Sequence, residues 1–211
     1  MDETPVWFEA PIKSTVEFKG SKTVPLLVNG CPRKAISAVL AVNQAGQALP
    51  PTVIVKSQSK TAKEAPGNTR TKIGDVYQYK QVNKTMTSHI MVDYIRNVPS
   101  PCYPINERKL LIMDCAPGHK TDQVKRACRE LNFDICMIPG GMTKHLQPLD
   151  ISVNRSFKAK LRRYHVQGLI DDRGSGSLIQ DISRAIKDVS VETIKNGFRK
   201  MYEYAGIDYQ E

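Results

Sequence analysis

Residues 145–165 read HLQPLDISVNRSFKAKLRRYH, and this stretch predicts a helix with one apolar face and one basic face. Apolar side chains recur at helical spacing, at Leu149, Val153, Phe157, Leu161 and Tyr164. Between Ile151 and His165 there are lysines and arginines but no aspartate or glutamate. Pro148 and Asp150 suit a first helical turn, because proline needs no amide partner there and the helix dipole stabilises an acid. An acid beside a basic helix also suggests a metal ion next to a phosphate backbone.

A second stripe of this helix carries Asp150, Asn154 and Lys158 at spacing four. An acid, an amide and a cation along one line suit a metal ion followed by a phosphate. Arg155 and Arg162 lie on a neighbouring line. The alternative is that Asp150 serves the helix dipole alone, and the pattern leaves both interpretations open.

Two further acids lie at the ends of expected strands. Asp114 ends the apolar run 109–113, which is typical of a strand buried on both faces of a sheet. It can point into a crevice at the sheet edge or cap the following turn. Asp2 opens a strand-like segment, and because side chains alternate along a strand, only Asp2 or Glu3 can face that crevice. Three carboxylates on separate elements can hold two divalent cations.

The rest of the chain predicts an α/β fold, with a mixed sheet of about five strands and helices on both faces. The segment 109–138 has a strand, helix, strand pattern, which implies parallel pairing. An exposed loop is expected at 57–72 and a break at 171–177. Further strands are expected at 4–8, 14–19, 34–43 and 52–56, and further helices at 85–98, 178–189 and 190–205, with Gly206 ending the last.

Composition narrows the class of protein. A chain of 211 residues is one domain of ordinary size. Its net charge of +10 fits a polyanionic partner, and nucleic acid is the first choice. The alternative is a basic protein with a solvated surface. The five cysteines show no zinc spacing, and their odd number without a signal peptide favours reduced thiols in the cytosol or nucleus. We expect Cys115, Cys128 and Cys136 to be small core residues, and no apolar run approaches a membrane span.

Two histidines lie close to the acids in sequence. His119 follows Asp114 by five residues, and His145 precedes Asp150 by five. Each could orient water or touch a phosphate, and a structural histidine is the alternative for both. Because Asp2 is the second residue, we also expect the strand that it opens to be truncated and N-terminal modules to be missing.

Three segments carry a family resemblance: DETPV at 2–6, LLIMDCAPGH at 110–119 and GGMTKHLQPLDISVNRSFKAKLR at 140–162. They resemble the pogo group of the Tc1/mariner-like transposases, which includes the Tigger elements and domesticated relatives of jerky and centromere protein B type. The resemblance implies a DDE superfamily endonuclease with an RNase H-like fold. It implies a catalytic core at 1–170 and a C-terminal helical extension of the same domain at 171–211.

The resemblance also implies the chemistry. The catalytic and metal-binding residues would be Asp2, Asp114 and Asp150, which favours Asp2 over Glu3, with two Mg²⁺ or Mn²⁺ ions. His119 and His145 would be accessory residues. Such enzymes nick transposon ends, and the freed 3′ hydroxyl attacks target DNA. The expected partner is DNA, contacted through Asn154, Arg155, Lys158 and Arg162; a homodimer in a transposition complex and a nuclear location are also expected. The alternative is a domesticated DNA-binding or chromatin protein without catalysis.

Overall fold

The computed structural model describes residues 1–8, 19–20, 35–56, 69–82, 85–171 and 177–209. Most of the expected strand at 14–19 lies outside these residues. The same holds for 57–68 of the expected loop, for most of the expected break at 171–177, and for Cys31.

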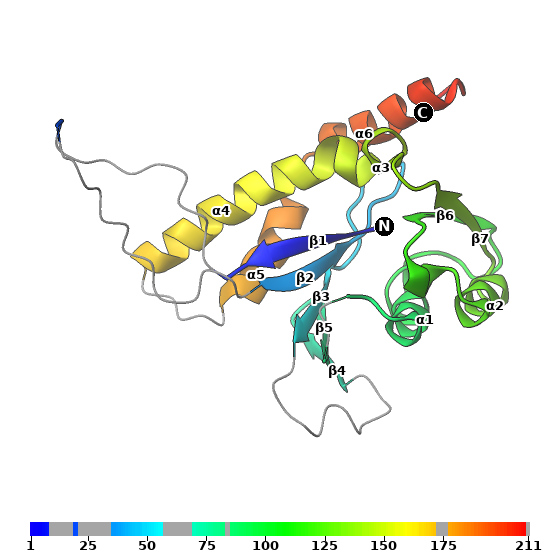
Figure 1. Ribbon diagram of the computed structural model, residues 1–211, viewed down its shortest axis with the longest axis horizontal. Coiled ribbons are helices and arrows are strands. Elements are labelled where there is room, and N and C mark those ends of the chain that lie inside the picture. The colour runs from blue at the N-terminus through cyan, green and yellow to red at the C-terminus, as the bar shows by residue number, and fades with distance from the viewer. Residues whose placement is uncertain (9–18, 21–34, 57–68, 83–84, 172–176, 210–211) are drawn as a thin grey trace.

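Five strands form a mixed sheet in the order β1-β2-β3-β5-β4 (Figure 1). Neighbours are antiparallel except for β3 and β5, which are parallel. Two more strands, β6 and β7, pair in parallel and form a separate sheet. The strands are β1 (Asp2–Trp7), β2 (Ala35–Leu40), β3 (Thr52–Lys56), β4 (Thr69–Ile73), β5 (Val76–Gln81), β6 (Lys109–Asp114) and β7 (Phe133–Ile138).

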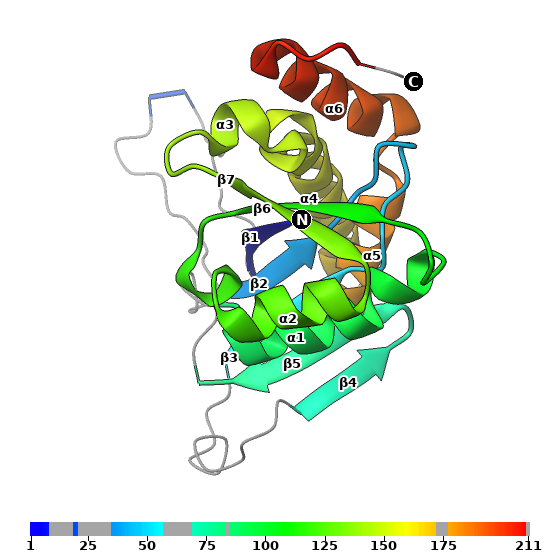
Figure 2. The same ribbon diagram turned by 90° about the vertical axis from the view of Figure 1, so that its right-hand side faces the viewer.

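The helices lie on both sides of the five-stranded sheet, with α4 and α5 on one side and α1 and α2 on the other (Figures 1 and 2). They are α1 (Ser88–Asn97), α2 (Asp122–Glu130), α3 (Thr143–Leu146), α4 (Asn154–Ile170), α5 (Ser177–Lys187) and α6 (Val191–Ala205). A π-helical turn, Leu149–Val153, leads directly into α4, and we call it the π turn. Gly206 ends α6 in the left-handed conformation at φ 69°, as expected.

Strand β2 separates two hydrophobic cores, because alternate residues of a strand face opposite ways. Ile36, Ala38 and Leu40 belong to the core that contains buried side chains of α4, α5 and α6. Val39 belongs to the other core, with side chains of α1, α2 and β6. This arrangement confirms the expected mixed sheet with helices on both faces.

The membership of the sheet differs from the prediction. Residues 69–72, expected in a loop, belong to β4, and β5 was not predicted at all. The polar composition of β4 fits its place at the edge of the sheet, whereas β5 lies between β3 and β4. The expected strands at 109–113 and 134–138 exist and are parallel, but they form their own sheet.

Strand β6 is buried on one face only, which corrects the expectation of a strand covered on both. Leu110 is 59% exposed, whereas Met113 is fully buried against α1 and α2. The cysteine expectation is likewise confirmed only for Cys128, because Cys136 lies on an exposed position of β7 and Cys115 is half-buried. No helix in the described ranges is long and apolar enough to cross a membrane.

Candidate functional site

The three acids lie at the ends of three elements. Asp2 is the first residue of β1, Asp114 is the last residue of β6, and Asp150 lies in the π turn. Asp2 and Asp114 are half-buried and Asp150 is exposed.

Asp2 and Asp150 meet at a single amide group. The Asn154 Nδ2 donates to Asp2 Oδ2 at 2.6 Å and to Asp150 Oδ1 at 3.1 Å. Asn154 is the first residue of α4 and is only 8% exposed. The structure therefore joins two acids that are distant in sequence through one buried side chain.

Strand alternation separates Asp2 from its neighbour. Glu3 Oε2 accepts a hydrogen bond from the Met86 backbone N–H at 3.0 Å, on the side of α1. Asp2 faces α4 instead. The structure thus places Asp2, and not Glu3, beside Asp150.

Burial raises the pKa of Asp2, the Asn154 hydrogen bond opposes this rise, and the nearby charge of Asp150 adds to it. Among the described residues, no lysine or arginine side chain forms an ion pair with either acid. The two carboxylates are therefore joined by an amide and not by a lysine or arginine, while the Met1 ammonium acts on Asp2 through space.

Asp114 has a different partner. His119 Nδ1 lies 2.7 Å from Asp114 Oδ1, and the Ala116 N–H donates to the same oxygen at 3.3 Å. The hydrogen bond from His119 is the main reason that the pKa of Asp114 is lowered. Asp114 thus does cap the turn that follows it, and the buried His119 contacts its carboxylate; an accessory role for His119 stays a prediction.

The start of the chain links β1 to β6. The Met1 ammonium donates to Ile112 O at 2.7 Å, and Gln147 Nε2 donates to Met1 O at 3.0 Å. Burial lowers the pKa of this ammonium to about 6, against the charges of Asp2 and Asp114, which raise it. Both acids are therefore close enough to act on one amine, although they share no hydrogen-bond partner.

Helix α6 packs closely against the π turn. A side chain at Gly197 would meet Pro148 O at 2.7 Å and Ser152 Oγ at 2.6 Å, so glycine is needed for this close approach. Ser152 Oγ in turn donates to Thr193 O at 2.8 Å. Gln147, Ser152 and Gly197 were not predicted as site residues, and no local pattern identifies residues that act by supporting a distant turn.

The donors suit a hard divalent cation, because Mg²⁺ prefers carboxylate and amide oxygens. Asn154 Oδ1 is buried and has no hydrogen-bond partner in the described part of the chain. Asp2, Asp150 and Asp114 are the residues that could hold such an ion. Among the residues described, however, no three His, Cys, Asp or Glu side chains gather closely enough to form a metal site.

The basic face of α4 is exposed beside the acids. Arg155, Lys158 and Arg162 are exposed, while Val153, Phe157 and Leu161 are buried on the opposite stripe. The expected apolar and basic faces are therefore present. Asn154 differs from the three cations because it is buried against Asp2.

His145 has its ring contact on α6 and not on the paired acids. Its exposed ring stacks on Tyr204 of α6, with ring centroids 4.6 Å apart and planes 12° from parallel. The structure shows no contact between His145 and Asp150, so an accessory role for His145 stays a prediction.

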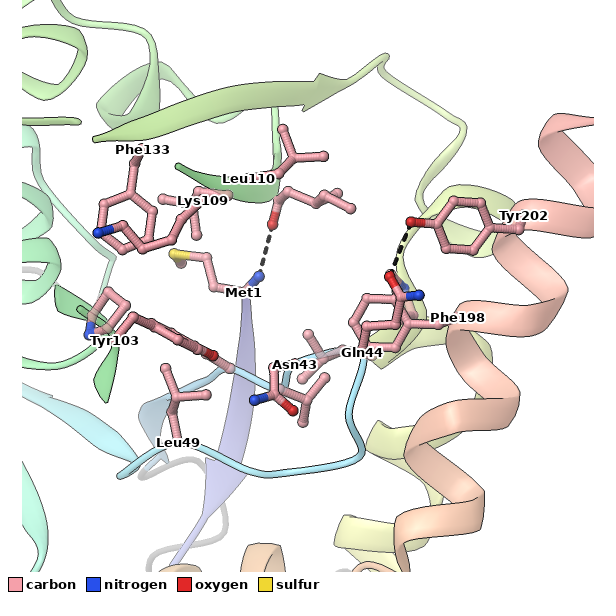
Figure 3. A pocket seen from close by; sticks show the side chains of 17 residues that line it. Met1, Asn43, Gln44, Leu49, Tyr103, Lys109, Leu110, Phe133, Phe198 and Tyr202 are labelled. Atoms are coloured by element: carbon pink, nitrogen blue, oxygen red, sulfur yellow. Dashed lines mark hydrogen bonds between the residues drawn. The ribbon is translucent and has the colours of Figure 1, made fainter. Parts of the chain in front are cut away.

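A pocket of about 280 Å³ lies between β6 and α6 (Figure 3). Leu49, Tyr103, Leu110 and Phe198 contribute apolar walls, and Met1 lies between them. None of the three acids lines it. The pocket is therefore distinct from the acidic site.

Comparisons with known proteins place the chain in a family. A family model described as "DDE superfamily endonuclease" matches residues 33–198, which include Asp114 and Asp150. The human protein "Pogo transposable element with KRAB domain" is 28% identical over 100% of this chain and 36% of its own length. The mouse protein of that name is 29% identical over 98% and 35%. The chain thus spans about a third of the length of these relatives.

One solved structure, "Mos1 transposase paired-end complex with left transposon end", is also similar. It shares 15% identity and a TM-score of 0.48, over 98% of this chain and 55% of that chain.

Proposed function

Because the chain belongs to the DDE superfamily endonuclease family, we propose that it is a metal-dependent DNA endonuclease and strand-transferase domain of a pogo-like transposase. The observation that carries the proposal is the shared amide between Asp2 and Asp150. Two acids held together without a cation, beside an exposed basic helix, suit a metal ion next to a DNA phosphate.

In this proposal, Asp2, Asp114 and Asp150 hold the metal. Two Mg²⁺ or Mn²⁺ ions would supply an activated water and stabilise the charge that develops on the attacking and leaving oxygens. Asn154 orients Asp2 and Asp150, and His119 orients Asp114. Arg155, Lys158 and Arg162 bind phosphates of the DNA backbone, in the nucleus.

A second candidate is a domesticated DNA-binding or chromatin protein without catalysis. One observation favours it: Asp114 is engaged by His119 and Ala116 and does not meet the other two acids at one point. The basic face of α4 would serve both candidates equally. The activity of the acids therefore discriminates between them.

We predict that the intact protein nicks supercoiled DNA when Mg²⁺ is present and that Asp114→Asn does not. The substitution keeps the shape of the side chain but removes the charge that would hold the metal. Metal-assisted charge stabilisation is worth several kcal/mol, so the nicking rate should fall by about 100-fold or more. Gel assays of relaxed against supercoiled plasmid measure this rate.

Asp134→Asn is the matched control, because Asp134 is an exposed acid on β7 that pairs with Arg108. It should nick DNA at the wild-type rate. Equal nicking by wild type and Asp114→Asn, or no nicking by wild type, would contradict the catalytic proposal and favour the second candidate.

A further inference from the structure

Asn154 has an unusual position for a helix-start residue, because one side chain reaches acids on two different elements. Its Nδ2 carries two hydrogens, so each can be donated to a different carboxylate. The partners are Asp2 on β1, at 2.6 Å, and Asp150 in the π turn, at 3.1 Å. The amide is thus a link between a strand and a helix as well as between two charges.

A comparison within the chain shows what is special about this link. Asn97 on α1 also donates to an acid four residues earlier, Asp93 Oδ1, at 3.0 Å. The charge of Asp93 is met by a cation, since Arg70 lies 3.3 Å from its other oxygen. Asp2 and Asp150 have no such ion pair among the described residues.

The charges of Asp2 and Asp150 and the unpartnered Asn154 Oδ1 both favour a cation at this site. Two carboxylates that share a site repel each other unless a cation or hydrogen-bond donors compensate. Here the hydrogen-bond donor is a neutral amide, which carries no compensating charge. The Met1 ammonium acts on Asp2 through space, but burial lowers the pKa of that ammonium to about 6. Asn154 Oδ1 is itself buried and unpartnered within the described residues, beside the two acids.

We propose that Asn154 is a positioning residue, whose amide gathers the carboxylates of Asp2 and Asp150 before a divalent cation binds. The inference rests on the proposed function, because it assumes that these acids hold the metal. Without the amide, the carboxylates would separate, and the metal would have to bring them together. Loss of a side chain that orients metal ligands typically weakens metal affinity by about 10–100-fold.

The test is a Mn²⁺ titration of the intact protein without DNA, in which free Mn²⁺ is measured by electron paramagnetic resonance. Asn154→Ala should raise the dissociation constant at least about 10-fold relative to wild type. Asn97→Ala, which removes an equivalent amide–carboxylate pair on α1, should leave it unchanged. Urea unfolding in EDTA, run on both variants, separates a loss of metal affinity from a loss of fold.

The outcomes separate the inference from the proposed function. Equal Mn²⁺ affinity in wild type and Asn154→Ala would overturn the inference and leave the proposed function standing. A wild-type protein that binds no Mn²⁺ would overturn both.

Asn154→Asp keeps the test open if Asn154→Ala does not fold. This variant keeps the shape of the side chain but replaces the donor with a third carboxylate. We expect it to be less stable than wild type in EDTA and to gain more stability from Mn²⁺ than wild type does. An Asn154→Asp protein that matches wild type in both conditions would overturn the inference.

Discussion

Asp2 and Asp114 carry the same side chain in opposite electrostatic surroundings. Burial raises the pKa of Asp2, whereas the hydrogen bond from His119 lowers the pKa of Asp114. The difference comes from neighbours on other elements and not from the residue type. Sequence could identify both acids as candidates, but their opposite behaviour depends on contacts that no local pattern contains.

A third acid, Asp75, is held in place by α5 and gives a prediction about pH. Its carboxylate accepts from Ser183 Oγ at 2.7 Å and lies 2.5 Å from Lys187 Nζ. Burial opposes the shift, but the hydrogen bonds from Lys187 and Ser183 outweigh it and lower the pKa of Asp75. The folded-state pKa is then below the unfolded value, so the stabilisation is present above the unfolded pKa and lost as pH falls through the folded one.

We therefore expect Asp75→Asn to lower the free energy of unfolding by about 1 kcal/mol near pH 7. The difference in the free energy of unfolding between wild type and Asp75→Asn should stay constant down to about pH 5. It should shrink below the ordinary aspartate pKa of about 3.9. Urea unfolding across this pH range measures it. Asp208→Asn, at an exposed acid beyond the last helix, should leave the free energy of unfolding unchanged at any pH; a pH-independent deficit in Asp75→Asn would contradict the assignment.

Among the secondary-structure elements, those with a strong apolar periodicity could be predicted from sequence, whereas the strands β4 and β5 could not. The apolar stripe of α4 is buried as its spacing predicts, because a helix that covers a sheet must bury one face. Strands β4 and β5 were missed because many of their residues are polar: β4 is an edge strand, and β5 lies between β3 and β4 but has only two buried residues. Within β5, only Val76 and Tyr79 are buried, and they are three positions apart, so the strand shows no regular alternation.

The basic face of α4 gives a prediction at this scale. Replacing Lys158 and Arg162 with alanine should weaken DNA binding and reduce the salt dependence of the binding constant. Two lost phosphate contacts lower the slope of log K against log salt by about 1.8. Fluorescence anisotropy with duplex DNA over a salt series measures both effects.

The control is a double alanine variant of one lysine and one arginine on another helix. Lys125 and Arg126 are exposed on α2, on the opposite side of the sheet, and their double alanine variant should bind like wild type. Equal salt slopes for wild type and the α4 variant would rule out α4 as the DNA-binding face.

For the whole molecule, the decisive feature is the pair of cores on the two faces of the five-stranded sheet. Sequence predicted this layered class, because the apolar patterns of helices and strands imply two covered faces. It did not predict that 109–138 forms a sheet of its own, since pairing partners are chosen by tertiary packing. The hydrogen bonds that join Asp2 and Asp150 to Asn154 could not be predicted either, because they too depend on tertiary packing.

We predict that Phe157→Ala lowers the free energy of unfolding by about 3–5 kcal/mol, because a fully buried aromatic ring leaves a cavity. Val166→Ala, on the same helix at a position that is 45% exposed, should change it little. Because β2 belongs to both cores, unfolding should remain a single transition by circular dichroism and by tyrosine fluorescence. Two separated transitions would show that the cores are independent.

The bond between Asn154 and Asp2 spans 152 positions of sequence. Contacts between such distant segments form late in folding, because the entropy of closing a long loop opposes them until neighbouring structure compensates. A partly folded chain would therefore have its basic helix before it has its paired acids. Under the proposed function, the chain would therefore attract polyanions during synthesis and refolding before its metal-binding acids come together.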